Sequence, residues 1–258
     1  MQFAELRERV VAANLALVEA GLVILTFGNA SIADRAAGVL AIKPSGVEYE
    51  TLRPEDVPVL DLASGAVVAG DRRPSADAPT HLFLVRAFAT VGAVVHTHSP
   101  YATAWAQARR DLPCLGTTHA DHFRGPVPVT RALTDAEIEA DYEVQTGAVI
   151  VETFANRNLD PVAVPAVLVA SHGPFVWGAS VEAAVENAVV LEDVARSSYR
   201  SISLAGDIEA IAEPLLAKHF ERKHGKPTGA NPLVIVRAFY ELFKLYRRIT
   251  TDASPARA

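Results

Sequence analysis

The stretch Val91-Gly92-Ala93-Val94-Val95-His96-Thr97-His98 joins an apolar run to two histidines that are two residues apart. The run predicts a buried β-strand over Ala93–His96. Because successive side chains of a strand point to opposite faces, residues two apart share a face and lie about 6.5–7 Å apart. The two imidazoles could therefore bind one divalent ion, although a strand can also carry two histidines for packing or solvation. Residues elsewhere in the chain must decide between these interpretations.

The composition is typical of one large α/β domain with a sizeable core. Of its 258 residues, 50% are hydrophobic and 21% are charged. The net charge of −6 speaks against a nucleic acid or an anionic membrane as a partner. The single cysteine, Cys114, can form no intramolecular disulfide, and no run approaches the ~18 apolar residues of a membrane-spanning helix. Together with an amino terminus that lacks a signal pattern, these features predict a cytoplasmic protein.

Periodicity and turn residues predict strands and helices mixed at irregular spacing, which favours an α/β sandwich or a mixed sheet over a regular βαβ series. Helices are expected over Phe3–Ala20, Pro79–Phe88, Pro100–Ala108, Thr134–Thr146, Val181–Arg196 and Leu233–Ile249. The chain beyond Arg196 is also expected to be helical, with a break at Gly225–Pro232. Strands are expected at Val23–Thr26, Ile32–Asp34, Val39–Ile42, Val57–Asp61, Ala93–His96 and Val167–Ala170, and Ala63–Ala66 predicts a hairpin turn.

Two further residues could join the histidine pair. His172 follows the strand predicted at Val167–Ala170, and Asp77 precedes the helix predicted at Pro79–Phe88. Each has a structural alternative, since His172 could serve only a strand-to-turn junction and Asp77 could be a helix cap or a solvated loop acid. Together with His96 and His98 they offer three imidazoles and a carboxylate. That set suits zinc or another first-row divalent ion, and does not suit magnesium or calcium.

Other polar stretches could bind an anion or move a proton. Thr26–Ser31 combines a glycine with small polar side chains, and Lys43-Pro44-Ser45-Gly46 places a cation beside a hydroxyl and a backbone amide. Phosphate sites need this combination, although both stretches could be ordinary turns. In the polar stretch 116–123, Asp121, His119 or His122 could act as a general acid or base, unless the stretch is a surface loop.

Taken together, these motifs resemble the class II aldolase/adducin family, and within it they closely resemble the L-ribulose-5-phosphate 4-epimerases. The resemblance extends from about residue 5 to Gly225. The motifs that carry it are Gly28-Asn29, Lys43-Pro44-Ser45-Gly46, Pro74-Ser75, Asp77, Pro79-Thr80-His81, His96-Thr97-His98, Gly116-Thr117-Thr118-His119-Ala120-Asp121, Thr134-Asp135-Ala136-Glu137-Ile138 and Ser171-His172-Gly173-Pro174-Phe175. It implies a single-domain α/β fold over residues 1–225, with a central, mostly antiparallel sheet flanked by helices. Residues 226–258 are then an atypical carboxyl-terminal extension.

Carried over residue by residue, the resemblance implies a catalytic zinc site and a substrate site. Zn²⁺, or another first-row divalent ion, would be bound by Asp77, His96, His98 and His172. The substrate phosphate would be bound by Gly28, Asn29, Lys43, Ser45, Gly46 and Ser75. Asp121 would be the acid/base residue, and Thr117, Tyr142 and Arg222 would line the site. The resemblance also implies a cyclic homotetramer with active sites completed by a neighbouring subunit.

The reaction implied is the interconversion of L-ribulose 5-phosphate, a phosphorylated pentulose, and D-xylulose 5-phosphate. In this family it proceeds by retro-aldol cleavage and aldol recombination through a metal-stabilised enediolate. The aspartate at position 77 favours this branch, since the aldolases of the family carry a glutamate there. The alternatives are a class II sugar-phosphate aldolase, an epimerase of a related sugar phosphate, and a non-catalytic scaffold like adducin.

Two positions depart from the family pattern. A tyrosine near the carboxyl terminus is the expected second proton carrier, and its position falls on Ala230. Tyr240 and Tyr246 could substitute for it, although their helical spacing is more typical of core or interface residues. The second departure is Ala76, where the family often has another serine.

Overall fold

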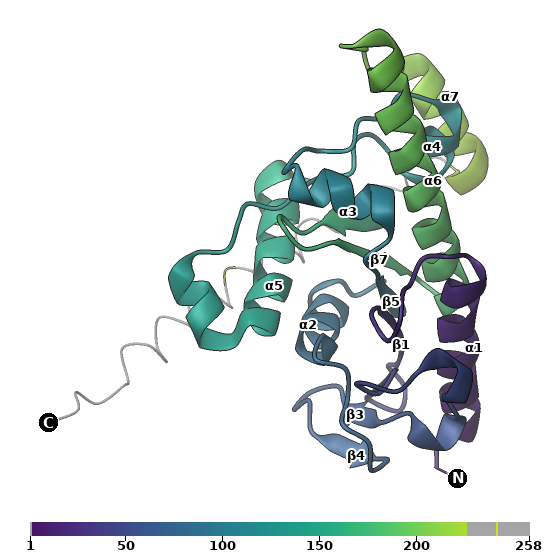
Figure 1. Ribbon diagram of the computed structural model, residues 1–258, viewed down its shortest axis with the longest axis vertical. Helices are drawn as coiled ribbons and strands as arrows, with labels where there is room; N and C mark the ends of the chain where they lie inside the picture. Colours follow the sequence, from purple (N-terminus) through teal and green to yellow (C-terminus); the bar gives the residue numbers. More distant parts are fainter. Residues whose placement is uncertain (1, 226–240, 242–258) are drawn as a thin grey trace, which may run out of the picture.

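The computed structural model describes residues 2–225 and 241, and its centre is a seven-stranded antiparallel sheet in the order β4-β3-β2-β1-β5-β7-β6 (Figure 1). The strands are β1 (Asn29–Asp34), β2 (Val39–Ile42), β3 (Val59–Asp61), β4 (Val67–Ala69), β5 (Ala93–His96), β6 (Ala166–Leu168) and β7 (Pro174–Gly178). The helices are α1 (Ala4–Glu19), α2 (Ala78–Ala87), α3 (Pro100–Gln107), α4 (Thr117–His122), α5 (Asp135–Arg157), α6 (Val181–Ala205) and α7 (Glu213–His224). Two 3₁₀ turns, Tyr49–Thr51 and Pro54–Asp56, connect β2 to β3.

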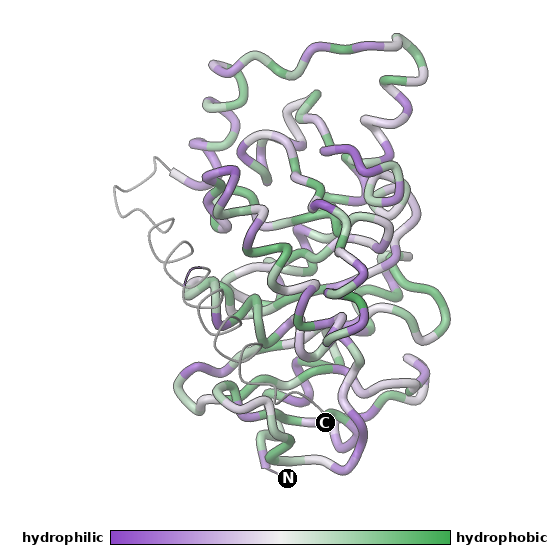
Figure 2. The backbone as a smooth tube through the Cα atoms, turned by 90° about the vertical axis from the view of Figure 1, so that its left-hand side faces the viewer, coloured by the Kyte–Doolittle hydropathy of each residue, from purple (hydrophilic) through white to green (hydrophobic). Residues whose placement is uncertain are grey.

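Each face of the sheet is covered by its own set of helices. Helices α1, α3 and α6 pack on one face, which includes Ala93 and Val95 of β5. Helices α2 and α5 pack on the other face, which includes Val94. Figure 1 shows α2 and α5 on one side of the strands and α1 and α6 on the other. Along the helices of Figure 2 the colour alternates between polar and apolar, as expected where one side of each helix meets the core. His96 follows the alternation of β5 and belongs to the α2–α5 face.

Most predicted elements are confirmed, with shifted ends. The first helix, the strands at Ile32–Asp34 and Val39–Ile42 and the helix before β5 form where periodicity placed them. Two helices are longer than predicted: α5 continues to Arg157 and α6 to Ala205. Strand β7 was not predicted. The stretch 116–123, for which a surface loop was one alternative, contains the helix α4. The helix expected at 233–249 lies outside the described residues.

The strand predicted at Val23–Thr26 is wrong. This apolar run forms a turn, closed by a hydrogen bond from the Phe27 amide to the Ile24 carbonyl. Leu25 has a φ of 53°, in the left-handed region that a strand cannot contain, and its side chain is 76% exposed. The run therefore remains at the surface, beside the start of β1.

Within the described part of the chain, no helix is long and apolar enough to cross a membrane.

Candidate metal centre

The sheet places His96 at the end of β5, opposite residues of both neighbouring strands. Its register partners are Asn29 on β1 and Phe175 on β7. Its ring stacks on that of Phe175, with 4.1 Å between centroids and 16° between planes. The Nδ1 of His96 lies 2.9 Å from the carbonyl oxygen of Pro174. Because a carbonyl can only accept, Nδ1 carries the proton and Nε2 is left with a free lone pair.

Three histidines meet at this point. The possible ligand atoms of His96, His98 and His172 all lie within 4.8 Å of one another. The Nε2 atoms of His96 and His98 are 3.1 Å apart, close to the roughly 3.3 Å that separates two nitrogens on a tetrahedral zinc with 2.0–2.1 Å bonds. The prediction that the His-x-His pair shares a face is confirmed. His172 reaches the pair from the turn between β6 and β7.

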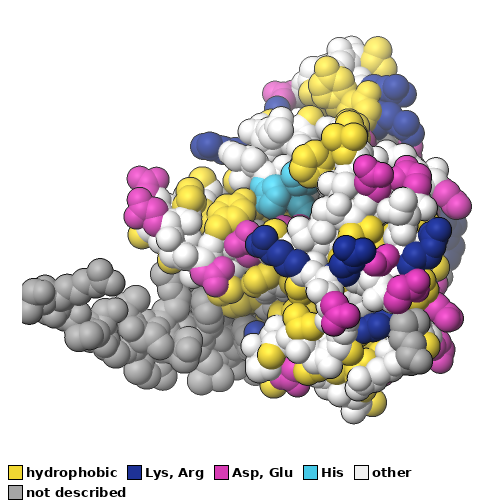
Figure 3. All heavy atoms as spheres, turned by 60° about the horizontal axis from the view of Figure 1, so that its bottom comes forward, with side chains coloured by type: hydrophobic (Ala, Val, Ile, Leu, Met, Phe, Trp, Pro, Cys, Tyr) yellow, Lys and Arg dark blue, Asp and Glu magenta, His cyan; other side chains and the backbone are white. Residues whose placement is uncertain are grey.

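The environment favours the form of these imidazoles that binds metal. Burial lowers the pKa of His96 and of His98, and it lowers the pKa of His172 to about 3. The rings are therefore neutral at physiological pH. Three neutral nitrogens that converge, with one ring already fixed by a carbonyl, form a donor set that suits a first-row divalent ion. His98 is exposed, so the centre opens to solvent, and Figure 3 shows histidine at the surface in a hollow.

Asp77 lies beside this group and is held by two predicted phosphate ligands. Its Oδ2 accepts hydrogen bonds from Asn29 Nδ2 at 2.7 Å and from Ser75 Oγ at 3.3 Å. Asn29 Nδ2 also donates to Ser75 Oγ at 3.0 Å. Burial raises the pKa of the Asp77 carboxyl, but the nearby His96 and His81 and the bond from Asn29 outweigh it, so the pKa is lowered. Asp77 is not among the atoms that lie within 4.8 Å of one another, but its charge acts on all three histidines.

The other predicted phosphate ligands come from two loops that flank β1 and β2. Lys43 is buried, its Nζ donates to the Thr26 carbonyl at 3.3 Å, and its ammonium lies 4.6 Å from the centre of the Tyr49 ring. Ser45 and Gly46 are exposed in the turn after β2. Gly28 has a φ of 85°, and a Cβ there would lie 2.7 Å from Val23 Cγ1, so glycine is required.

Tyr142 reaches the centre because of a kink in α5. Asp141 has non-helical angles (φ −136°, ψ 86°), and this break turns the next residue toward the sheet. The Tyr142 hydroxyl lies 3.3 Å from Nδ1 of His172. Of the described tyrosines, it alone contacts a histidine of the group. Burial is the main cause of its raised pKa, so its phenol is protonated.

Asp121, Thr117 and Arg222 form a second group, on α4 and α7. Asp121 Oδ1 accepts from His219 Nδ1 at 3.0 Å and from Arg222 Nη2 at 3.1 Å. Burial raises the pKa of Asp121, but the bond from His219 and the charge of Arg222 lower it overall. Thr117 begins α4. Among the residues that the structure describes, none of these three contacts His96, His98 or His172.

Sequence reasoning missed residues that pack next to the histidines of the centre. His81 is fully buried on α2, where its Nδ1 lies 2.7 Å from Ser31 Oγ, and its ring meets Phe175 edge-on. Phe27 stacks on His98 at 6.2 Å. One signal was available for His81, because it follows Asp77 by one helical turn. The contacts of Phe27 and Phe175 depend on strand pairing and on a turn that the local pattern misjudged.

The fold matches known proteins. The family model described as Class II Aldolase and Adducin N-terminal domain matches residues 8–199. An L-fuculose 1-phosphate aldolase aligns with a TM-score of 0.71 at 25% identity, over 85% of this chain and 96% of its own. YgbL from Klebsiella pneumoniae aligns with a TM-score of 0.66 at 24% identity, over 84% of this chain and 99% of its own. A sugar-phosphate aldolase from Thermotoga maritima aligns with a TM-score of 0.63 at 20% identity, over 81% of this chain and 99% of its own. The family match covers most of the chain, and the chain therefore belongs to the class II aldolase and adducin family.

Proposed function

We propose that the chain is a metal-dependent sugar-phosphate enzyme that interconverts L-ribulose 5-phosphate and D-xylulose 5-phosphate. The observation that carries this proposal is the group of His96, His98 and His172, whose ligand atoms lie within 4.8 Å of one another. Asp77 adjoins them and would complete the ligand set. A divalent ion there would supply Lewis acidity for the negative charge that develops when the sugar skeleton is cleaved. Zinc is the ion that this donor set favours.

The chemistry consists of one carbon–carbon bond broken and re-formed. The C4 hydroxyl loses its proton and becomes an aldehyde carbonyl as the C3–C4 bond breaks, and the electron pair of that bond is delocalised toward the C2 carbonyl. The aldehyde fragment turns its other face, the bond re-forms, and the C4 oxygen regains a proton. One group must take the first proton and another must return it from the opposite face. Asp121 is proposed for the first task, because its lowered pKa keeps the carboxyl ionised and therefore able to accept a proton.

Asn29, Ser75, Lys43, Ser45, Gly46 and Gly28 are proposed to bind the phosphate, which would retain the aldehyde fragment while it turns. Asn29 and Ser75 already contact Asp77, so the phosphate would lie next to the metal ligands. The short Asp77 side chain accepts two hydrogen bonds, which keeps it ionised. This supports a role as a ligand over a role as a general base.

Asp121 would act in the active site of a neighbouring subunit. Within one chain, Asp121 accepts hydrogen bonds from His219 and Arg222 of α7. In the part of the chain that the structure describes, it does not contact the histidine group. A homotetramer with sites between subunits would bring it to the metal centre of another copy, where Thr117 and Arg222 would accompany it. Light scattering coupled to size exclusion tests this, with a mass of four chains expected.

Product analysis of the zinc-loaded protein tests the reaction. Incubation with L-ribulose 5-phosphate should yield D-xylulose 5-phosphate, and dialysis against a chelator should abolish the yield until zinc is restored. Free glycolaldehyde phosphate without D-xylulose 5-phosphate would contradict epimerisation. That outcome would favour the second candidate, an aldolase, for which the likeness to an L-fuculose 1-phosphate aldolase speaks.

A further inference from the structure

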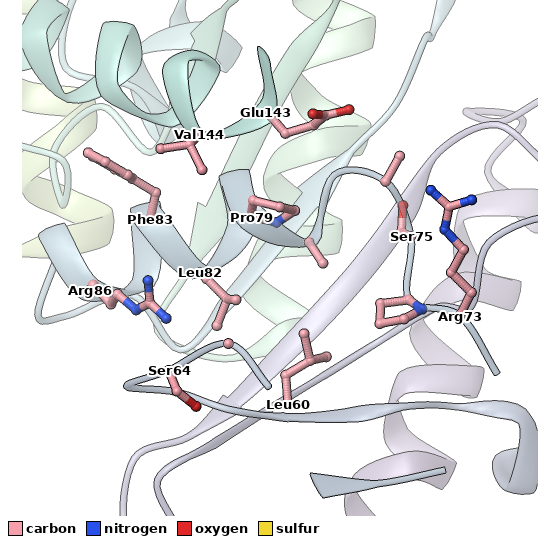
Figure 4. A pocket seen from close by; sticks show the side chains of 14 residues that line it. Leu60, Ser64, Arg73, Ser75, Pro79, Leu82, Phe83, Arg86, Glu143 and Val144 are labelled. Atoms are coloured by element: carbon pink, nitrogen blue, oxygen red, sulfur yellow. The ribbon is translucent and has the colours of Figure 1, made fainter. Parts of the chain in front are cut away.

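A pocket of about 690 Å³ adjoins the metal centre and is not explained by the metal ligands. It lies between the β3–β4 turn, the loop before α2, α2 itself and the start of the continuous part of α5 (Figure 4). Ser75 lines it and also bonds to Asp77, so the pocket and the metal centre share this serine. In Figure 4, Arg73 and Ser75 lie together on one side of the pocket, and Arg86 and Ser64 lie on the other.

The main chain fixes Arg73 next to the predicted phosphate loop. The Ser45 amide donates to the Arg73 carbonyl at 2.9 Å, and the Ser75 amide donates to the Lys43 carbonyl at 3.1 Å. An antiparallel bridge joins Pro44 and Pro74 between these bonds. Main-chain hydrogen bonds therefore join the two loops on both sides of this bridge and hold the Arg73 backbone beside Ser45.

The charge of Arg73 is not used within the fold. Its guanidinium makes no hydrogen bond or ion pair with any residue in 2–225 or 241. The adjacent Arg72 is different, because its Nε binds Asp56 Oδ1 at 3.0 Å. Arg86, across the pocket, donates from Nε to the Leu62 carbonyl at 2.7 Å and is close to the charge of Asp61. The uncompensated positive charge of the pocket is therefore on the side of Arg73 and Ser75.

We propose that Arg73, together with Ser75, binds the anionic group of the phosphorylated substrate from the pocket side. The inference rests on the proposed function, and it adds a residue to the binding site. A guanidinium presents two parallel N–H donors, which match two oxygens of a phosphate. It would also compensate for Ala76, which lines the same pocket and lacks a hydroxyl. Glu143 also lines the pocket, and its negative charge would oppose the anion.

The test compares Arg73→Gln and Arg73→Lys with Arg72→Gln, all as zinc-loaded protein. Calorimetric titration with inorganic phosphate measures anion binding without any reaction. Arg73→Gln should weaken the Kd at least about tenfold, which corresponds to about 1.4 kcal/mol. Arg73→Lys should bind phosphate more tightly than Arg73→Gln but less tightly than the unchanged protein, because lysine keeps the positive charge but lacks the two parallel N–H donors. Arg72→Gln should stay within about twofold of the unchanged protein.

Kinetics with L-ribulose 5-phosphate give a second, independent measurement. Loss of an anion contact that is equally strong in the bound substrate and in the transition state raises KM and leaves kcat unchanged. Arg73→Gln should therefore raise KM about tenfold at constant kcat, with bound zinc unchanged. The proposal is overturned if the unchanged protein does not bind phosphate, or if Arg73→Gln binds it as well as Arg72→Gln. If phosphate binding depends on Arg73 but no sugar phosphate is converted, the anion site stands and the proposed function fails.

Discussion

Replacing Asn29 by alanine should lower the free energy of unfolding of the metal-free protein by an amount that depends on pH. Asn29 is 3% exposed, and its Nδ2 donates to Asp77 Oδ2 and to Ser75 Oγ. A hydrogen bond to a charged group contributes about 1.5–3 kcal/mol, and one between neutral groups about 0.5–1.5 kcal/mol. Water can replace part of this at the partly buried Asp77. We therefore expect a loss of about 2–3 kcal/mol in the free energy of unfolding at pH 7.

The pH dependence follows from the lowered pKa of Asp77. A carboxyl whose pKa is lower in the folded state stabilises the fold above its unfolded pKa, near 3.8, and this contribution is lost as the pH falls through the folded value. Once Asp77 is protonated, the bond from Asn29 no longer involves a charge. The difference between Asn29→Ala and the unchanged protein should therefore shrink below about pH 4.

Urea unfolding of the chelator-treated proteins at pH 7 and at pH 3 measures both quantities. Asn14→Ala is the matched control, because Asn14 is also a buried amide, but its bonds go to the Val10 and Ala30 main chain on the opposite face of the sheet. It should cost a similar free energy with no such change below pH 4. Equal losses for Asn29→Ala at both pH values, or no loss at pH 7, would refute the reasoning.

Three further perturbations have separate expected outcomes. Asp121→Asn should abolish or sharply reduce epimerisation while bound zinc stays near one per chain, and loss of zinc in that variant would mean that its role is misassigned. Burial lowers the pKa of His81 to about 3, so in this pH range the unfolded state binds a proton at His81 that the folded state does not bind. The free energy of unfolding of the metal-free protein should therefore fall as the pH drops from 6.5 toward 4. A free energy of unfolding that does not change over this range in chemical denaturation would contradict this. Gly147→Ala would place a Cβ 2.6 Å from Phe83 Cβ at the α2–α5 contact and should cost about 1–3 kcal/mol in thermal unfolding, whereas Gly116→Ala, which meets nothing within 4 Å, should be near neutral; equal melting temperatures would contradict the packing.

Local periodicity was sufficient for the parts of the site that lie close in sequence. His96 and His98 could be assigned to one face because strand alternation is a property of the backbone itself. The approach of His172 to this pair, and the position of Asp77 beside it, could not come from spacing, since they depend on the register of β5 against β1 and β7. There the family resemblance supplied what the pattern could not.

The failures have physical causes of the same kind. Leu25 belongs to an apolar run that predicts a strand, but its left-handed φ places it in a turn. The contact of Asp121 with His219, about a hundred residues away on α7, was missed, whereas the catalytic role of Asp121 itself stays a prediction. Ion pairs between distant helices leave no periodic signal in the sequence.

The bond from His96 Nδ1 to the Pro174 carbonyl has a consequence for the choice of metal. Pro174 begins β7 directly after the turn that carries His172, so the orientation of one ring depends on the segment that supplies another. The His96 ring is thus oriented by the protein and not by the ion. A cation that needs a wider spacing between the nitrogens would have to turn this ring and break its bond to Pro174, which would favour first-row divalent ions over larger ones.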